Sequence, residues 1–119
     1  MTKLQAMTEG GARLGWIKKQ LLDAVTVGAT PLEIDSLADR LIREGGDKAS
    51  FKMEPGYRHA TCVNVNAGMV HGIPNSTPFR AGDVVKIDMG LFHNGYHLDT
   101  AATVQLPPLN TKVTQFLEV

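Results

Sequence analysis

The chain has 119 residues, of which 43% are hydrophobic and 20% charged, and 12 Lys and Arg residues balance 12 Asp and Glu residues. This length allows one small domain with a hydrophobic core. A formal charge of zero leaves no basic surface for nucleic acid or an anionic membrane. The single cysteine cannot form an internal disulfide, and the sequence has neither a signal peptide nor an apolar run of roughly 18 residues. These features predict a cytoplasmic protein with no membrane partner.

Two amphipathic helices are predicted in the first part of the chain. The first spans about Gly11 to Val25, where apolar residues recur with the helical period. The second begins at Thr30-Pro31-Leu32-Glu33, which combines an N-cap, a proline in the first turn and the glutamate of a capping box. Its apolar face consists of Ile34, Leu37, Ala38, Leu41 and Ile42. Gly45-Gly46 offers the left-handed stop that ends it.

Beyond Gly46 the helical period gives way to β-prone runs separated by glycine and proline. These runs are Thr61 to Val65, Val84 to Met89, Leu91 to Phe92 and Tyr96 to Val104. Residues 111–119 have the pattern of the first two turns of another helix, inside which the chain ends. Helices followed by strands predict an α+β fold.

The last strands read as one hairpin, because Asn94-Gly95 is the typical sequence of a two-residue type I′ turn. With these residues at the tip, Gly90 faces Asp99 and Asp88 faces Ala101. Asp88 and Asp99 then lie on the same face as diagonal neighbours, roughly 7–8 Å apart at the backbone. Gly90, which has no side chain, leaves room for the two carboxylates.

Two acids on one face of a hairpin are either solvated charges or metal ligands. Asp88 follows Val84-Val85-Lys86-Ile87 and precedes Met89, so we expect it to point into a buried region, where an unpaired carboxylate is costly. A cation would remove that cost. Carboxylate oxygens suit Mn²⁺, Fe²⁺, Co²⁺, Mg²⁺ or Zn²⁺, and the sequence does not rank these metals.

The histidines form a second group of candidates. His71 precedes the turn Gly72-Ile73-Pro74 and is either a loop histidine or a donor to a substrate carbonyl beside the metals. His59 carries less weight. His97 shares the parity of Asp99, which makes it a candidate support of the site, whereas His93 is expected to be solvated at the turn. Cys62 is expected to be a small buried apolar residue, since no general base adjoins it in the sequence.

Four stretches of the sequence form one larger pattern: Cys62 to Asn66, His71 to Pro74, Gly82 to Gly90, and Asn94 to Thr100. Together they closely resemble the methionine aminopeptidases of the pita-bread metallopeptidase family, and the resemblance covers nearly the whole chain. It implies that residues 1–119 are the N-terminal half of a single pita-bread catalytic domain, cut within a helix at the C-terminal end.

The resemblance implies removal of the initiator methionine from nascent peptide N-termini by a metal-activated hydroxide at a dinuclear centre. Two divalent ions (Co, Mn, Fe, Zn or Ni) would be held in part by Asp88, which would chelate one, and by Asp99, which would bridge both. His71 would be catalytic and hydrogen-bond the substrate near the scissile bond. Phe51, Tyr57 and Cys62 match positions that line the methionine pocket. The ribosome is a further candidate partner.

The resemblance also implies a missing part, because the family completes its centre with a histidine and two glutamates from the second half of the fold. We therefore expect the 119 residues to be incomplete for catalysis and to self-associate through the face meant for the missing half. One alternative is a proline-specific aminopeptidase or prolidase, which the sequence disfavours because Asp99 is followed by Thr100-Ala101-Ala102-Thr103 and not by the usual Asp-x-Thr-Arg pattern. The other alternative is a non-catalytic peptide- or protein-binding module.

Overall fold

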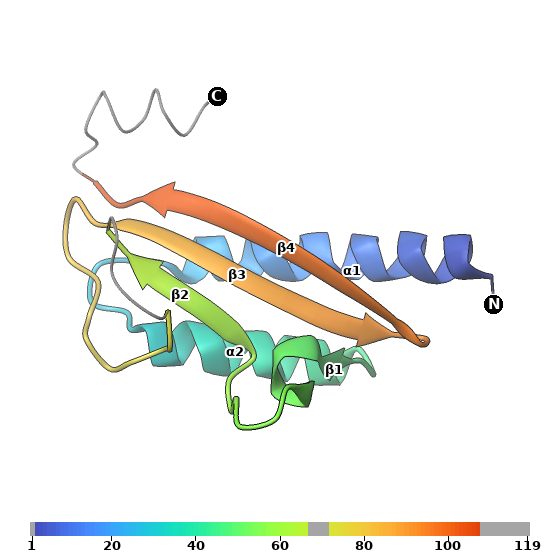
Figure 1. Cartoon of the computed structure of the whole chain (residues 1–119). Helices are drawn as coiled ribbons and strands as arrows, with labels where there is room; N and C mark the ends of the chain where they lie inside the picture. The colour runs from blue at the N-terminus through green and yellow to red at the C-terminus, as the bar shows by residue number, and fades with distance from the viewer. Residues whose placement is uncertain (1, 67–71, 108–119) are drawn as a thin grey trace.

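A computed structural model of the chain describes residues 2–66 and 72–107. Two long helices, α1 (Lys3–Ala24) and α2 (Pro31–Glu44), precede all the strands, as the sequence predicted (Figure 1). They are followed by β1 (Lys48–Ala49), the short 3-10 helix η1 (Ser50–Met53), β2 (Thr61–Val65), β3 (Val84–His93) and β4 (Tyr96–Gln105). The helix predicted over 111–119 lies outside the described residues.

The start predicted for α1 at Gly11 is wrong, because the helix begins eight residues earlier, at Lys3. Thr2 and Gln5 form a capping box: the Thr2 hydroxyl accepts from the Gln5 amide at 3.1 Å, and Gln5 Oε1 accepts from the Thr2 amide at 2.9 Å. Gly10 lies inside the helix and is buried against the sheet. A Cβ atom there would stand 2.7 Å from Leu98 Cδ1, so this glycine lets α1 lie close to β4.

The second helix begins where the sequence predicted. The Thr30 hydroxyl accepts from the Glu33 amide at 3.2 Å, and the Glu33 carboxylate accepts from the Thr30 amide at 3.3 Å. Gly46 adopts a φ of +84°, which confirms the left-handed stop. The predicted apolar face is confirmed, with Leu37 only partly buried. Asp35 is also buried on that face, which the sequence reading did not anticipate.

The sheet is antiparallel, with β3 as its central strand. β4 pairs with β3 along its whole length on one side, while β2 and β1 pair with successive parts of β3 on the other. The predicted register is confirmed: Gly90 faces Asp99 and Asp88 faces Ala101. Asn94 and Gly95 both have positive φ, 48° and 88°, as a type I′ turn requires. β3 runs without interruption through Gly90.

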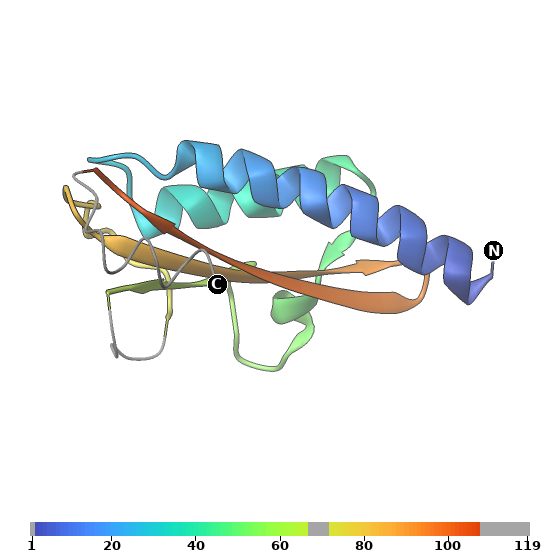
Figure 2. The ribbon, with the colours of Figure 1, turned by 90° about the horizontal axis from the view of Figure 1, so that it is seen from above.

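The two helices cover one face of the sheet (Figure 2). α1 packs on β3 and β4, and α2 packs on β1 and β2. The core between the layers includes Ile17, Leu21, Ile34, Ile42, Phe79, Val85, Ile87, Met89 and Leu91. The opposite face, which we call the open face, carries η1 (Figure 2). None of the helices in the two described ranges has the length and apolar character that a membrane span requires.

Candidate functional site

The open face of the sheet brings the two predicted carboxylates together. Asp88 on β3 and Asp99 on β4 are diagonal neighbours in the register, and both line one pocket of about 530 Å³. The lining residues are Phe51, Cys62, Asp88, Met89, Asp99, Thr100 and Ala101. The pocket therefore joins two acids to an apolar wall that η1 and β2 supply.

The expectation that Asp88 points into a buried region is wrong. The Asp88 side chain is 32% exposed, and Asp99 is an exposed residue. The apolar neighbours Ile87 and Met89 point the other way, toward the helices, because side chains alternate along a strand. Lys86 Nζ lies 4.0 Å from Asp88 Oδ1 across water-accessible surface. Both carboxylates are therefore accessible to solvent and to a ligand.

Gly90 makes room for Asp99, as the sequence predicted. A Cβ atom on Gly90 would come within 3.0 Å of Asp99 Oδ1, 3.1 Å from the Leu98 carbonyl oxygen and 3.2 Å from Ser50 Cβ. Any side chain at this position would clash with the Asp99 carboxylate. The glycine therefore permits the position that Asp99 has on the open face.

The donor set fits part of a divalent metal site. Two carboxylates on one pocket wall are the hard oxygen ligands that such ions bind. Within residues 2–66 and 72–107, however, no cluster of three or more His, Cys, Asp or Glu side chains has metal-binding geometry. Asp88 and Asp99 can supply two ligand groups, and the others would have to come from elsewhere.

The apolar wall of the pocket is built by Phe51 and Cys62. Cys62 is half-buried and faces Asp88 in the register. Tyr57 is not among the lining residues and stands behind them: its ring meets Phe51 edge to face at 6.3 Å, and its hydroxyl lies 3.3 Å from Cys62 Sγ. The same hydroxyl donates to the Thr61 carbonyl at 2.6 Å. Burial, followed by the hydrogen bond to Cys62, raises the pKa of Tyr57 well above its usual value.

The four histidines have separate environments. His71, the predicted catalytic residue, lies outside the described residues. His97 is exposed on the open face, and its Nδ1 lies 3.0 Å from Ser50 Oγ, which places it near Gly90 and the Asp99 side of the site. His59 is bound to Asp35 behind the apolar wall.

The expectation that His93 is solvated is wrong. Its side chain is 11% exposed, with Nδ1 2.6 Å from Asp47 Oδ1 and Nε2 3.2 Å from Glu9 Oε2. Arg13 also reaches Asp47, at 2.6 Å. The hydrogen bond to Asp47 raises the pKa of His93. This cluster fastens α1 to the turn end of the hairpin, so the turn residue belongs to the packed layer.

The sequence reading missed the role of Asp35. This carboxylate, 7% exposed, accepts from the Thr61 amide at 2.9 Å and from the Thr61 hydroxyl at 2.7 Å, and its other oxygen lies 3.1 Å from His59 Nδ1. Its position next to Ile34 and three residues before Ala38 is the sequence signal, because it puts an acid on the buried face of α2.

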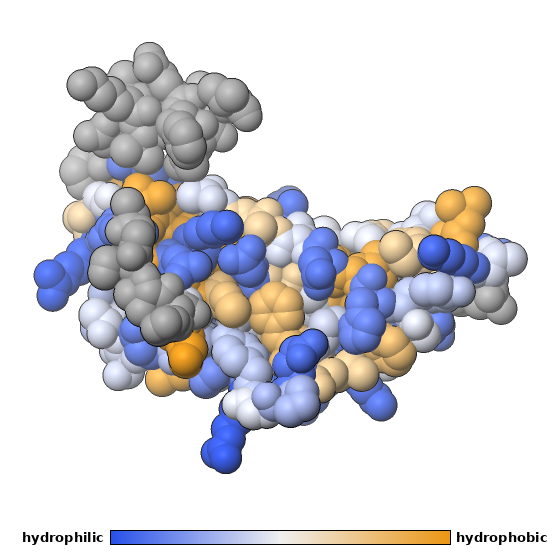
Figure 3. Space-filling view, in the orientation of Figure 1, coloured by the Kyte–Doolittle hydropathy of each residue, from blue (hydrophilic) through white to orange (hydrophobic). Residues whose placement is uncertain are grey.

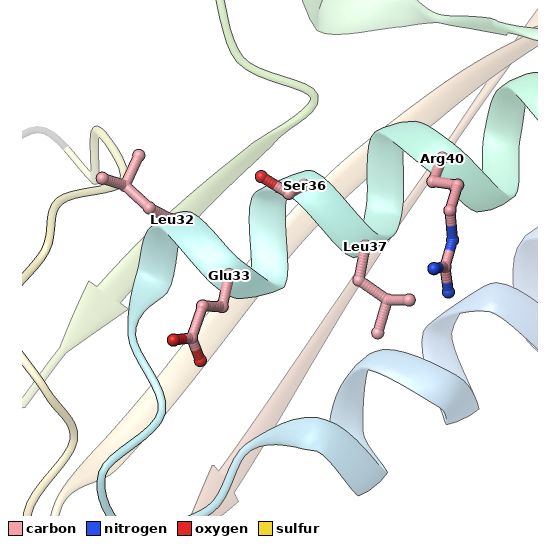
Figure 4. A pocket seen from close by; sticks show the side chains of 5 residues that line it. All are labelled: Leu32, Glu33, Ser36, Leu37 and Arg40. Carbon is pink, nitrogen blue, oxygen red and sulfur yellow. The ribbon is translucent and has the colours of Figure 1, made fainter.

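A second hollow, of about 430 Å³, follows the outer side of α2 and lies in the helix layer, away from the carboxylates. It is lined by Leu32, Glu33, Ser36, Leu37 and Arg40 (Figure 4). Its one carboxylate, Glu33, already caps the helix. The hollow therefore offers no pair of acids comparable to Asp88 and Asp99.

Comparison with known proteins places the chain in a family. Residues 5–118 match the model of "Metallopeptidase family M24". The chain belongs to this family. Methionine aminopeptidase 1 of Bacillus subtilis is 36% identical over 117 residues, which are 98% of this chain and 47% of that protein. The family is one of metallopeptidases, so divalent metal ions are the expected cofactors.

Solved structures of the family share the same architecture. The crystal structure of methionine aminopeptidase from Thermotoga maritima superposes with a TM-score of 0.91 at 26% identity and covers 100% of this chain and 49% of that one. The X-Pro aminopeptidase of Thermotoga maritima has a TM-score of 0.77 at 19% identity and covers 95% of this chain and 31% of that one, a likeness of fold. The predicted pita-bread fold is thereby confirmed. The chain spans about half the length of the Bacillus subtilis and Thermotoga maritima methionine aminopeptidases.

Proposed function

We propose that this chain is the first half of the catalytic domain of an enzyme that removes the N-terminal methionine from nascent peptides. The observation that carries the proposal is that Asp88, Asp99, Phe51 and Cys62 line one and the same pocket. A metallopeptidase that cleaves after an apolar N-terminal residue needs hard oxygen ligands for the metal and an apolar slot for the side chain. This pocket offers both. The names and sequences of the relatives support the same activity.

In this proposal Asp88 would hold one of two divalent ions, and Asp99 would be shared by both. Ions held there would supply an activated water and a positive charge beside the peptide carbonyl. A histidine and two glutamates from the second half of the fold would complete the ligand set. The ions are drawn from Co, Mn, Fe, Zn and Ni, among which two carboxylates do not discriminate.

The apolar wall accounts for the substrate side chain. Phe51 and Cys62 contact it directly, and Tyr57 backs both residues. His71 hydrogen-bonds the substrate near the scissile bond. Methionine, long and unbranched, suits a slot between an aromatic ring and a thiol. The cytoplasm is the predicted location of this enzyme. The ribosome, where nascent N-termini emerge, is a predicted partner.

A proline-specific peptidase is the second candidate, favoured by the fold likeness to the X-Pro aminopeptidase. Two sequence features oppose it: Thr100-Ala101-Ala102-Thr103 after Asp99, and the methionine-enzyme form of His71-Gly72-Ile73-Pro74. A non-catalytic binding module would keep the fold without turnover.

The test uses the polypeptide that carries the complete fold, assayed on Met-Ala-Ser and on Ala-Pro-Ser with and without a chelator. We expect methionine release that EDTA abolishes and divalent ions restore. Release of alanine from Ala-Pro-Ser alone would favour the proline-specific enzyme, and no release from either peptide in the metal-loaded protein would favour the binding module.

Site variants make the assignment residue by residue. Asp88→Asn and Asp99→Asn should each lower the amount of bound metal found by elemental analysis. Each should also reduce activity by more than about 100-fold, which is more than the loss of a residue that only supports a metal ligand usually causes. Asp23→Asn makes the same chemical change on the exposed side of α1 and should leave both quantities unchanged. Unchanged metal content in Asp88→Asn would remove Asp88 from the site.

A further inference from the structure

The apolar wall of the pocket is tied to helix α2 through one buried carboxylate. Asp35 accepts two hydrogen bonds from Thr61, one from the amide and one from the hydroxyl. Thr61 is fully buried and is the first residue of β2. Cys62, the next residue, faces the pocket and Asp88. Asp35 therefore fixes the point from which β2 presents Cys62.

A second branch from Asp35 runs through three rings. Asp35 Oδ2 lies 3.1 Å from His59 Nδ1, within hydrogen-bonding distance. The His59 ring meets Tyr57 edge to face with centroids 5.7 Å apart and planes at 72°. Tyr57 meets Phe51 in the same way at 6.3 Å and 72°. Asp35 thus orients, ring by ring, the side chain that forms the aromatic wall.

The two branches meet again at the pocket. The Tyr57 hydroxyl donates to the Thr61 carbonyl at 2.6 Å and lies 3.3 Å from Cys62 Sγ. Asp35 holds the amide and hydroxyl of Thr61 while Tyr57 holds its carbonyl. The loop is closed, so the thiol and the aromatic ring that face a substrate cannot shift independently.

We infer that Asp35 and His59 are positioning residues that set the distance between the Phe51 and Cys62 walls and so determine which N-terminal side chain the pocket accepts. The inference rests on the proposed peptidase function for its substrate. Side chains that touch a ligand keep their geometry only when a supporting shell locks them, and small displacements change selection between similar side chains. Neither Asp35 nor His59 lines the pocket, so both act through Tyr57, Thr61 and Cys62.

Cys62 reports on this arrangement directly, because it is the only cysteine of the chain. The rate of its alkylation by iodoacetamide would be measured in the folded chain. Asp35→Asn and His59→Gln should each raise that rate about tenfold, the lower range for loss of a supporting group. His59 is partly exposed, with 25% of its side chain accessible, so His59→Gln serves where Asp35→Asn does not fold.

The control is Thr30→Ala, which removes the cap of the helix that carries Asp35 but touches none of these contacts. A merely structural role for Asp35 predicts that all destabilised variants expose Cys62 equally. The inference requires a faster rate in the Asp35 and His59 variants than in Thr30→Ala at matched fraction folded. Equal rates in the three variants would overturn it.

Specificity is the second readout, in the polypeptide with the complete fold. His59→Gln should raise KM for Met-Ala-Ser about tenfold with kcat nearly constant, and it should lower the preference for methionine over leucine at the N-terminus. A loss confined to kcat, or an unchanged methionine preference, would overturn the inference. If the wild-type polypeptide releases neither methionine nor leucine, the proposed function fails. The alkylation rates of Cys62 still test the positioning network on their own.

Discussion

Replacement of Gly90 by alanine tests whether the open face is built around the Asp99 carboxylate. The added methyl would come within 3.0 Å of Asp99 Oδ1 and stand 3.1 Å from the Leu98 carbonyl oxygen. Overpacking costs about 1–3 kcal/mol, and removal of glycine from a strand returns about 0.5–1 kcal/mol. Gly90→Ala should therefore lower the free energy of unfolding by about 0.5–2 kcal/mol.

Urea unfolding followed by circular dichroism measures this change, with Gly15→Ala as the control. Gly15 lies in α1, and an added Cβ meets nothing within 4 Å, so alanine there should stabilise by about 0.8–1 kcal/mol from helix propensity alone. If Gly90→Ala stabilises the chain as Gly15→Ala does, the close packing at Gly90 is refuted.

A double-mutant cycle assigns the cost to its partner. In the Asp99→Ala background the carboxylate is gone, and the methyl still lies 3.1 Å from Leu98 O and 3.2 Å from Ser50 Cβ. The cost of Gly90→Ala should then fall by about 1 kcal/mol, the usual coupling of residues in contact. Strict additivity of the two changes would show that Asp99 does not occupy the space above Gly90.

Three further results are expected. The raised pKa of His93 means that its contribution to stability is complete below about pH 6.5, the value for an unfolded chain, and is lost as pH rises through the folded pKa. The unfolding free energy of the wild type should therefore fall as the pH rises above about 6.5, and it should change less in His93→Gln, which should also lose about 1 kcal/mol at about pH 6. Equal slopes would exclude His93 as the titrating group. Gly95→Ala should cost about 1–2 kcal/mol because alanine is strained at a φ of 88°, and an unchanged denaturation midpoint would count against the type I′ turn. Residues 1–119 alone should self-associate in sedimentation experiments, since Leu4 and Trp16 are 76% and 55% exposed; a monomer with a cooperative melt would contradict this.

Local signals in the sequence predicted the parts of the fold that local signals control. The Asn94-Gly95 turn fixed the hairpin register, and with it the meeting of Asp88 and Asp99. The capping box at Thr30 located α2. The turn and the capping box both depend on hydrogen bonds or dihedral angles within a few neighbouring residues, so the local sequence is enough to predict them.

The errors arose where distant segments meet. Gly10 obscured the start of α1, because this glycine is needed for the close approach of Leu98 from β4. His93 reads as a turn residue until Asp47 and Glu9 are brought to it from 46 and 84 positions away. Asp35 is paired with Thr61, 26 positions along the chain. No local pattern specifies such partners.

The environment of the carboxylates was misjudged for a related reason. Apolar neighbours on both sides of Asp88 indicated burial, yet alternation sends Ile87 and Met89 to the helices and Asp88 to the open face. Figure 3 shows the described part of that face as a mixture of hydrophilic and hydrophobic residues. The large exposed apolar side chains belong mostly to the helices and loops.

The β3–β4 register that places Asp88 and Asp99 on one face limits how the sequence of the hairpin can vary. A slip of one residue between β3 and β4 would turn Asp99 toward α1, and a slip of two would either set it directly against Asp88 or move it opposite Phe92. Side chains around the pocket can change one at a time, but the number of residues between the two acids cannot. Insertions and deletions across 89–98 should therefore be selected against more strongly than substitutions there, even at positions that touch no ligand.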